Sequence, residues 1–328
     1  MSGASIPYHL RPNKAIDRYA FLELLSKIDK YCNIESYKYI GFGGHSLEDF
    51  KYIHSRFGIN NMLSIESNRE VYNRQKFNQP HNCIDCLQQS SGEFLNAFQR
   101  EEETIIWLDY VKPSELRMQI EEFQATISKL ESRDIVKITV NFHASSYVAS
   151  DKSKRSFELQ NERINKLKEI LGDLFPAAEV IADMMTEKRF TEALCLVIKY
   201  AANLTMRGED NIFFQPLTTF CYADGQNMLT VTGILLKSDE IEAFFNTTNI
   251  DKWELSNTKW EKPKRINIPD LTIKERLHID SQLPNSQAKT IQDNLGFLFD
   301  SKESTSLEML EAYILFYRQS PYFSRILV

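Results

Sequence analysis

The chain has 328 residues and a formal net charge of −6, and charged residues make up 26% of it. This composition is that of a globular protein large enough to bury a core without disulfides. The acidic balance disfavours general electrostatic attraction to nucleic acid or anionic lipid. The N-terminus lacks a signal-peptide pattern, no apolar run approaches the ~20 residues of a membrane span, and the five cysteines form no paired framework. We therefore predict a cytoplasmic protein.

Apolar residues indicate a helix over 14–31, followed by a regular alternation of strands and helices. The fourth strand contains the continuous apolar run Ile105-Ile106-Trp107-Leu108, which is typical of a strand buried on both faces of a parallel sheet. The predicted strands cover 36–42, 61–66, 82–87, 104–110 and 134–142, and the predicted helices cover 46–57, 68–77, 92–100, 113–130, 157–175 and 187–206.

Two further strands, over 212–222 and 228–236, are joined by Ala223-Asp224-Gly225-Gln226, a connection short enough for an antiparallel hairpin. The pattern predicts an α/β fold, with a doubly wound, Rossmann-like, mostly parallel sheet that ends in an antiparallel hairpin.

Residues 246–264 are polar and are interpreted as a linker or a wrapping segment, and helices are predicted over 271–282 and 307–319. We therefore predict an N-terminal helical segment over 1–35, a Rossmann-like domain over 36–245 and a helical C-terminal extension over 246–328.

The strongest chemical signal is Gly41-Phe42-Gly43-Gly44, where the first strand enters a helix. Ligands of such sheets bind at the carboxyl ends of the strands, and glycines there allow close approach of the backbone. Glu66 ends the second strand, where a carboxylate can accept hydrogen bonds from ribose hydroxyls. A loop that is glycine-rich for structural reasons alone is the other interpretation.

These motifs resemble those of class I S-adenosylmethionine (SAM) methyltransferases, in particular the catechol O-methyltransferase type, over residues 36–236. Gly41-Phe42-Gly43-Gly44 is similar to the cofactor loop and Leu63-Ser64-Ile65-Glu66 to the ribose-binding strand end. Leu87-Gln88-Gln89-Ser90-Ser91 is similar to the segment that contacts the adenine. Ile105-Ile106-Trp107-Leu108-Asp109-Tyr110 is similar to the fourth-strand motif, and Val140-Asn141 is similar to the end of the fifth strand.

The resemblance implies SAM as the cofactor and the following roles. The implied cofactor-binding residues are Gly41, Gly43, Gly44, Glu66, Ser91 and Asp109, and the implied catalytic residues are Asp109, Tyr110 and Asn141. The chain departs from the pattern at Tyr39, where the family usually has an acidic residue, and at Val140, where the catechol type has a magnesium ligand. We therefore predict no metal. A helix cap is the alternative role for Asp109.

Candidate substrate-binding residues follow from charge and position. Arg11, Lys14 and Arg74 can hold an anionic substrate, a phosphate or the SAM carboxylate, although basic residues at helix ends are often only solvated. His143 follows the fifth strand, where it can line the cleft and act as an acid or base, or serve as a structural histidine. Trp253 and Trp260 lie in an aromatic and basic stretch that can contact nucleic acid.

The predicted function is SAM-dependent methyl transfer, with oxygen as the acceptor atom suggested by the resemblance. The acceptor stays open among small molecules, proteins and nucleic acids, with no membrane partner. The alternative is an inactive methyltransferase-like subunit that binds a nucleotide or a protein partner. An NAD-dependent enzyme is a weaker interpretation, which the hairpin over 212–236 disfavours. The C-terminal helices are candidates for homo-oligomer formation or partner binding, or they belong to the core.

Overall fold

The computed structural model describes residues 11–151, 153–206 and 211–321, and these residues form two compact units. The larger unit consists of Leu22–Cys221 and Gln226–Pro263. The smaller unit takes in the described parts of Met1–Phe21, Tyr222–Gly225 and Lys264–Val328. The domain limits given in the sequence analysis stay a prediction.

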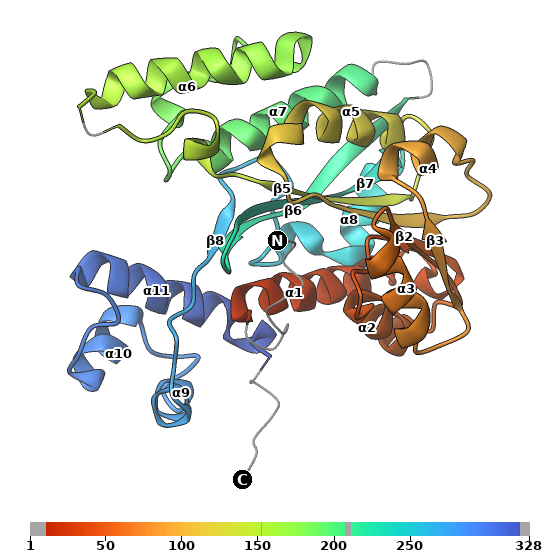
Figure 1. Cartoon of the computed structure of the whole chain (residues 1–328). Coiled ribbons are helices and arrows are strands. Elements are labelled where there is room, and N and C mark those ends of the chain that lie inside the picture. Colours follow the sequence, from red (N-terminus) through yellow and green to blue (C-terminus); the bar gives the residue numbers. More distant parts are fainter. Residues whose placement is uncertain (1–10, 152, 207–210, 322–328) are drawn as a thin grey trace. The chain divides into compact units, whose positions relative to one another are not determined.

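The larger unit is built on a sheet with the strand order β3-β2-β1-β4-β5-β7-β6 (Figure 1). The first five of these strands pair in parallel, and β7 pairs with β5 antiparallel. This arrangement confirms the predicted α/β fold with its antiparallel hairpin. The strand bounds are β1 (Lys38–Gly41), β2 (Asn61–Glu66), β3 (Ile84–Gln88), β4 (Thr104–Asp109), β5 (Ile135–Asn141), β6 (Ile212–Ala223) and β7 (Asn227–Lys237).

Helices cover both faces of this sheet. The helices α4, α5, α6 and α7 lie on one side of it, and α2, α3 and α8 lie on the other (Figure 1). Among the described residues, no helix has the length and apolar character that crossing a bilayer requires. The helix bounds are α1 (Pro12–Ile28), which begins in the smaller unit, α2 (Glu48–Phe57), α3 (Arg69–Asn78), α4 (Ser91–Ala97), α5 (Leu116–Ile127), α6 (Ser156–Leu171), α7 (Phe190–Thr205) and α8 (Ile241–Thr248).

The two faces of the sheet differ because strand side chains alternate. Ile106 and Leu108 of β4 belong to the main apolar cluster with the residues of α5. Trp107 points the other way, and its indole N–H donates to the Thr139 hydroxyl over 2.9 Å. The Lys137 ammonium lies 4.2 Å from the centre of the Trp107 ring, although Lys137 is only 1% exposed. The second face is therefore partly polar.

Local signals explain where the site-forming helices begin. The Asn68 side chain accepts from the N–H groups of Glu70 and Val71 at the start of α3. Ser90 and Glu93 form a reciprocal capping box at the start of α4. Such side chains satisfy the otherwise unpaired N–H groups of a first helical turn. Both helices are thereby fixed at the ends of β2 and β3.

The smaller unit has its own apolar cluster, formed by Ile279, Ala288, Ile291, Leu310 and Tyr313. Its elements are β8 (Lys264–Ile266), α9 (Ile273–Asp280), α10 (Ala288–Leu295) and α11 (Glu303–Phe316). The helices α9 and α11 correspond to the two C-terminal predictions. The sequence analysis did not predict β8, α10 or, in the larger unit, α8.

Within the larger unit, the segment that follows α8 packs rather than links. Ile250, Trp253 and Leu255 are buried. The Asn257 N–H donates to the Leu217 carbonyl of β6 over 2.7 Å. The Trp260 ring packs 6.0 Å from that of Phe214. The linker interpretation was therefore wrong, and the wrapping interpretation was right. The few apolar residues of this polar stretch are buried against residues that are distant in sequence.

Candidate active site at the carboxyl edge of the sheet

Four predicted site residues lie at the ends of parallel strands. Gly41, Glu66, Asp109 and Asn141 end β1, β2, β4 and β5. Parallel strands end at one edge, called here the carboxyl edge, so the structure brings these residues to the same side of the sheet. Gly41 pairs with Ser64 and Trp107, two residues before the ends of β2 and β4. β1 therefore ends two residues before its neighbours, and the glycine loop begins there.

The glycine loop follows β1 closely. The Gly43 N–H donates to the Ser64 hydroxyl over 3.2 Å. A Cβ atom at Gly43 would lie 2.5 Å from a methyl carbon of Leu47 and 2.8 Å from the Phe50 ring. Gly44 has φ of +52°, a left-handed conformation that glycine adopts at little cost. Packing and backbone conformation thus require these glycines and hold their backbone near the strand ends.

Tyr39 occupies the position where the resembling family has an acidic residue. It is 1% exposed, and its ring contacts that of Phe50 edge-on at 4.8 Å. A Cβ atom at Gly41 would lie 3.0 Å from the Tyr39 hydroxyl oxygen. The tyrosine thus packs beneath the start of the glycine loop, and a side chain larger than hydrogen at position 41 would crowd it.

Glu66 lies at the end of β2, where a backbone donor orients it. One carboxylate oxygen accepts the Asn68 N–H over 2.7 Å. Burial raises the pKa of Glu66, and the backbone N–H groups of Asn68 and Ser67 oppose this shift. The carboxylate is therefore held at a strand end in partly desolvated surroundings, where its negative charge is disfavoured until a hydrogen-bond donor approaches.

Tyr110 points away from Asp109, toward α4 and α5. Its hydroxyl donates to the Glu122 carboxylate and hydrogen-bonds with Ser91. Burial, followed by the negative charge of Glu122, raises the pKa of Tyr110, so the phenol stays neutral. Its ring contacts Phe42 of the glycine loop at 5.6 Å. The structure therefore brings two predicted residues, Tyr110 and Ser91, into direct contact, and it adds a partner of Tyr110 that the sequence analysis missed, Glu122.

Asn141 links the end of β4 to the loop after β5. Its amide nitrogen donates to the Val111 carbonyl over 3.4 Å, and its amide oxygen accepts the His143 N–H over 3.0 Å. Both partners are backbone groups, so the side chain fixes the relative positions of these two segments. Asn141 thereby places His143 near the residues that follow Asp109.

His143 lies in a polar cluster that the sequence analysis did not foresee. Its Nε2 atom is 2.9 Å from the Ser145 hydroxyl, and its Nδ1 atom is 3.4 Å from a Glu187 carboxylate oxygen. The His143 side chain is 51% exposed. Glu187 is distant in sequence and no local motif marks it, so only the fold could reveal the pairing.

The predicted substrate-binding arginine and lysine residues fall in both units. Burial lowers the pKa of His45, and the positive charge of Arg74 in α3 lowers it further. Arg74 therefore lies near the end of the glycine loop. In the same helix Asn78 donates to the His45 carbonyl over 2.8 Å. Arg11 and Lys14 belong to the smaller unit, where the Lys14 N–H donates to Asp224. The binding roles of Arg11, Lys14 and Arg74 stay predictions.

Possible metal ligands and the cysteines also bear on the chemistry that the described residues can support. In that part of the chain, no three His, Cys, Asp or Glu side chains are grouped as a metal site. No disulfide joins any of the five cysteines, including Cys83 and Cys86. The candidate site is thus built from glycine backbone, carboxylates, amides, one tyrosine and one imidazole.

The strand order, the antiparallel β7 and the glycine loop at the carboxyl edge define a class I methyltransferase fold. Residues 6–328 match the model of a family described as "Putative O-methyltransferase", and the chain belongs to that family. Membership confirms the resemblance drawn from the sequence. A search among curated proteins finds no match.

Several solved structures are similar to this chain at low sequence identity. A protein described as a "putative O-methyltransferase from Klebsiella pneumoniae" is 10% identical with a TM-score of 0.39, and the match covers 70% of this chain and 92% of that protein. Trm1 from Pyrococcus horikoshii, solved with S-adenosyl-L-methionine, is 10% identical with a TM-score of 0.44 and coverages of 71% and 57%. The plantazolicin methyltransferase BamL, solved with S-adenosylhomocysteine (SAH), is 13% identical with a TM-score of 0.35 and coverages of 67% and 85%.

Proposed function

We propose that the chain binds SAM at the carboxyl edge and transfers its methyl group to an oxygen atom of an acceptor. One observation carries this proposal. In a member of an O-methyltransferase family, the glycine loop and the ends of β2, β4 and β5 meet at one edge. The residues fit the cofactor, because closely held loop backbone and the partly desolvated Glu66 carboxylate suit a ligand that carries a ribose.

Each cofactor-binding residue has a proposed part. The backbone at Gly41, Gly43 and Gly44 lies against the methionine and ribose portions, and Glu66 accepts from the ribose hydroxyls. Ser91, at the start of α4, neighbours the adenine. When bound, the cofactor supplies an electrophilic methyl group on a sulfonium. Because methyl transfer is an in-line displacement, the protein contributes chiefly by aligning the acceptor.

The proposed catalytic residues differ in how they act. Asp109 and Asn141, at the ends of β4 and β5, border the acceptor side. Tyr110 acts as a positioning residue, because its hydroxyl is bonded to Glu122 and Ser91. It supports the segment that follows β4 and the start of α4. His143 and Arg74 are proposed to contact the acceptor or an anionic group on it.

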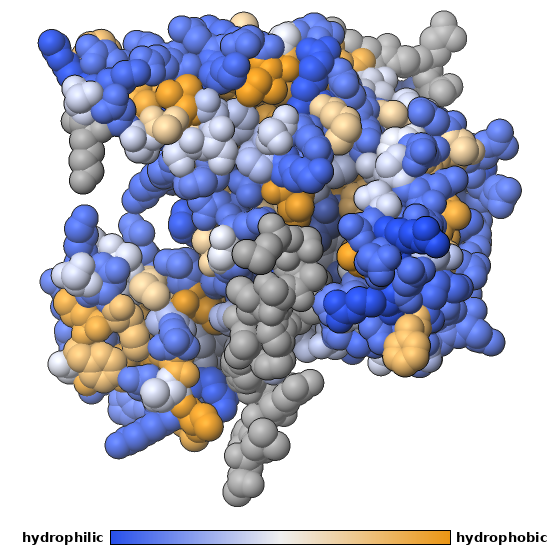
Figure 2. Space-filling view, in the orientation of Figure 1, coloured by the Kyte–Doolittle hydropathy of each residue, from blue (hydrophilic) through white to orange (hydrophobic). Residues whose placement is uncertain are grey.

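The acceptor, the partners and the location extend the proposal. A small molecule, a protein or a nucleic acid can carry the acceptor oxygen. Figure 2 shows apolar residues gathered on the surface of the smaller unit, over α9 and α10, where Ile273 and Leu277 are 70% and 47% exposed. This surface supports homo-oligomer formation or partner binding through the C-terminal helices. The lack of disulfides among the five cysteines supports a cytoplasmic location.

Calorimetric titration of the full chain with SAM and SAH tests the cofactor proposal. We expect wild type to bind in the micromolar range and Glu66→Gln to lose about 1–3 kcal/mol, or roughly 5- to 150-fold in Kd, because the ribose hydroxyls lose a charged acceptor. Glu70→Gln is the matched control, since Glu70 is an exposed glutamate in the next helix, and its affinity should equal that of wild type.

The alternative function makes a different prediction. An inactive subunit that uses the same fold for another ligand would bind neither SAM nor SAH, and that result would contradict the proposal. The packed Tyr39 in place of the family's usual acidic residue is the feature that favours this alternative.

A further inference from the structure

Three side chains beyond the end of β5 lie in series, with the His143 imidazole between the Ser145 hydroxyl and the Glu187 carboxylate. The Ser145 hydroxyl lies 2.9 Å from His143 Nε2, and Glu187 Oε2 lies 3.4 Å from His143 Nδ1. The imidazole therefore has a hydroxyl at one nitrogen and a carboxylate at the other. An ionised carboxylate can only accept a hydrogen bond, so it favours a proton on Nδ1. The Nε2 lone pair then faces the hydroxyl.

Glu187 is itself held in place by its second oxygen. Oε1 accepts the Ser145 N–H over 3.2 Å and lies 3.5 Å from the Arg163 guanidinium. Arg163 is 4% exposed. It donates to the carbonyl of Met185 over 3.0 Å and to the hydroxyl of Ser150 over 3.2 Å. A buried arginine thus ties the loop after β5 to the segment that carries Glu187.

One neighbour competes for Nδ1. The Asn227 amide nitrogen lies 3.4 Å from it and can donate only when Nδ1 has no proton. Glu187 Oε2 lies equally near Nδ1, and its negative charge favours a proton on that nitrogen, so we expect the Nδ1–H tautomer to dominate. This competition gives the arrangement a measurable consequence.

The cluster also lies where an acceptor can reach it. Asn141 accepts the His143 N–H and donates to the Val111 carbonyl, which joins the histidine to the end of β4. His143 is 51% exposed, and the adjoining Val111 is an exposed apolar residue at 42%. An acceptor can therefore place an apolar group near Val111 while its hydroxyl reaches Nε2.

We propose that His143 is the general base of the methyl transfer, that Glu187 is its positioning residue, and that the acceptor is an alcohol or phenol whose hydroxyl takes the place of the Ser145 hydroxyl at Nε2. This inference rests on the proposed function. A base must lie within hydrogen-bond reach of the proton that it removes, and the Ser145 oxygen shows that a hydroxyl fits at that distance.

The chemistry of this step balances. The O–H bond of the acceptor breaks and its proton passes to His143 Nε2. The oxygen forms a bond to the methyl carbon, and the electron pair of the broken carbon–sulfur bond stays on sulfur. The imidazolium, stabilised by Glu187, returns its proton to solvent through its exposed face. Ser145 has no covalent role, which distinguishes this arrangement from a hydrolytic triad in which the serine is the nucleophile.

Long-range ¹H–¹⁵N spectra of the imidazole nitrogens in the full chain test the arrangement directly. His143→Gln identifies the signals of this residue among the six histidines. We expect wild type to show the Nδ1–H tautomer at neutral pH. Glu187→Gln should shift the population toward Nε2–H, because the introduced amide can donate to Nδ1.

Two kinds of control accompany this measurement. Glu169→Gln changes an exposed glutamate of α6 and should leave the tautomer unchanged, and so should Ser145→Ala. An Nε2–H tautomer in wild type would overturn the base assignment, since no lone pair would face the acceptor. An unchanged tautomer in Glu187→Gln would overturn the role of Glu187.

The proposed function fails by a different observation. If wild type binds neither SAM nor SAH in calorimetry, methyl transfer is overturned whatever the tautomer is. If it binds both and His143 holds its proton on Nε2, only the inference about the base is overturned.

Discussion

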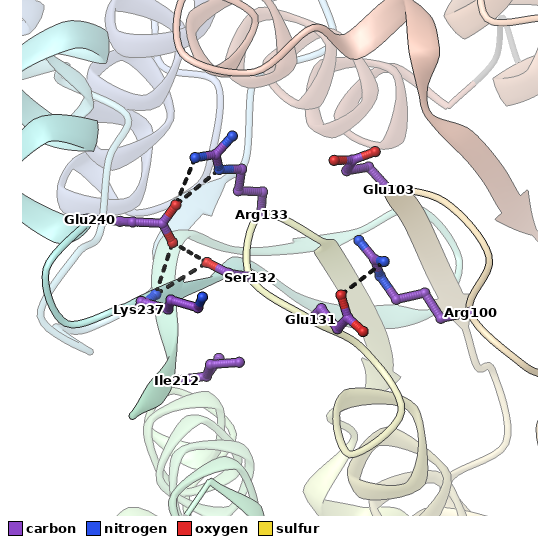
Figure 3. Close-up of a pocket in the computed structure, with 8 residues that line it drawn as sticks. All are labelled: Arg100, Glu103, Glu131, Ser132, Arg133, Ile212, Lys237 and Glu240. Atoms are coloured by element: carbon purple, nitrogen blue, oxygen red, sulfur yellow. Dashed lines mark hydrogen bonds and ion pairs between the residues drawn. The ribbon is translucent and has the colours of Figure 1, made fainter. Parts of the chain in front are cut away.

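The two edges of the sheet in the larger unit use polar side chains differently. At the carboxyl edge, Glu66 and Asn141 are fixed by backbone groups, and His143 is half exposed. At the opposite edge, called here the amino edge, charged residues line a cavity of about 560 Å³ (Figure 3). The lining residues are Arg100, Glu103, Glu131, Ser132, Arg133, Ile212, Lys237 and Glu240.

Most of the charges at the amino edge pair with one another. Arg100 lies 3.0 Å from Glu131 and donates to Asp134 over 2.6 Å, and Arg133 lies 2.9 Å from Glu240. Asp134 also accepts the Thr104 N–H over 2.7 Å, at the start of β4. These contacts join the starts of neighbouring strands. A charged cavity is therefore not by itself a ligand site, and strand direction is the better guide to one.

The largest effect is expected at the amino edge. Asp134→Ala should lower the free energy of unfolding by about 3–5 kcal/mol, because Arg100 and the N–H groups of Thr104 and Glu131 lose their partner. Urea denaturation measures this loss, and the folded fraction should bind SAH as wild type does. Asp173→Ala removes an exposed partner of Arg117 and should leave the transition unchanged. Weakened SAH binding by folded Asp134→Ala would break the separation of the two edges.

A smaller effect is expected where Tyr110 meets Glu122. Tyr110→Phe should destabilise the chain by about 1–3 kcal/mol, because the buried Glu122 carboxylate loses a donor. Tyr147→Phe is the matched control, since the buried Tyr147 hydroxyl has no hydrogen-bond partner among the described residues and its removal should be neutral or stabilising. Thermal denaturation compares the two variants. Equal stability of both would argue against a supporting role for Tyr110.

The smallest effect is a pH dependence at Glu66. An ordinary glutamate has a pKa of about 4.3. Because burial raises the pKa of Glu66 in the folded chain, its carboxylate becomes protonated at a higher pH than that of an ordinary glutamate. SAH affinity should therefore fall on acidification, by at most about tenfold per pH unit. Calorimetry at successive pH values follows this loss, and Glu66→Gln should not show it. A pH-independent wild type would remove Glu66 from the ribose site.

The same shift has the opposite sign for stability. A raised folded-state pKa means that Glu66 contributes stability below its unfolded-state pKa, and this contribution is lost as the pH rises through the folded-state pKa. At neutral pH the ionised carboxylate is therefore a cost, and Glu66→Gln should not lower the melting temperature. Loss of binding without loss of stability would mark Glu66 as a ligand-binding residue.

The sequence predicted secondary-structure elements better than it predicted contacts between side chains. The apolar run of β2 was predicted over the same residues that the structure shows, Asn61–Glu66, and repeated βα units indicated the parallel sheet. The helix predicted over 113–130 begins as a 3-10 turn at Pro113–Glu115 and continues as α5. Strand periodicity implies that Asp109 and Tyr110 point to opposite faces. Periodicity cannot show that Tyr110 meets Glu122, because that contact depends on how α5 packs.

The most direct test of the central claim is a crystal structure of the chain with SAH. We predict the ligand at the carboxyl edge, with its ribose hydroxyls on the Glu66 carboxylate and its adenine beside Ser91. The amino-edge cavity should not hold it, and the pairs that Arg100 and Arg133 form there should be unchanged. Density for SAH in the amino-edge cavity, or at the carboxyl edge but away from Glu66, would contradict the account.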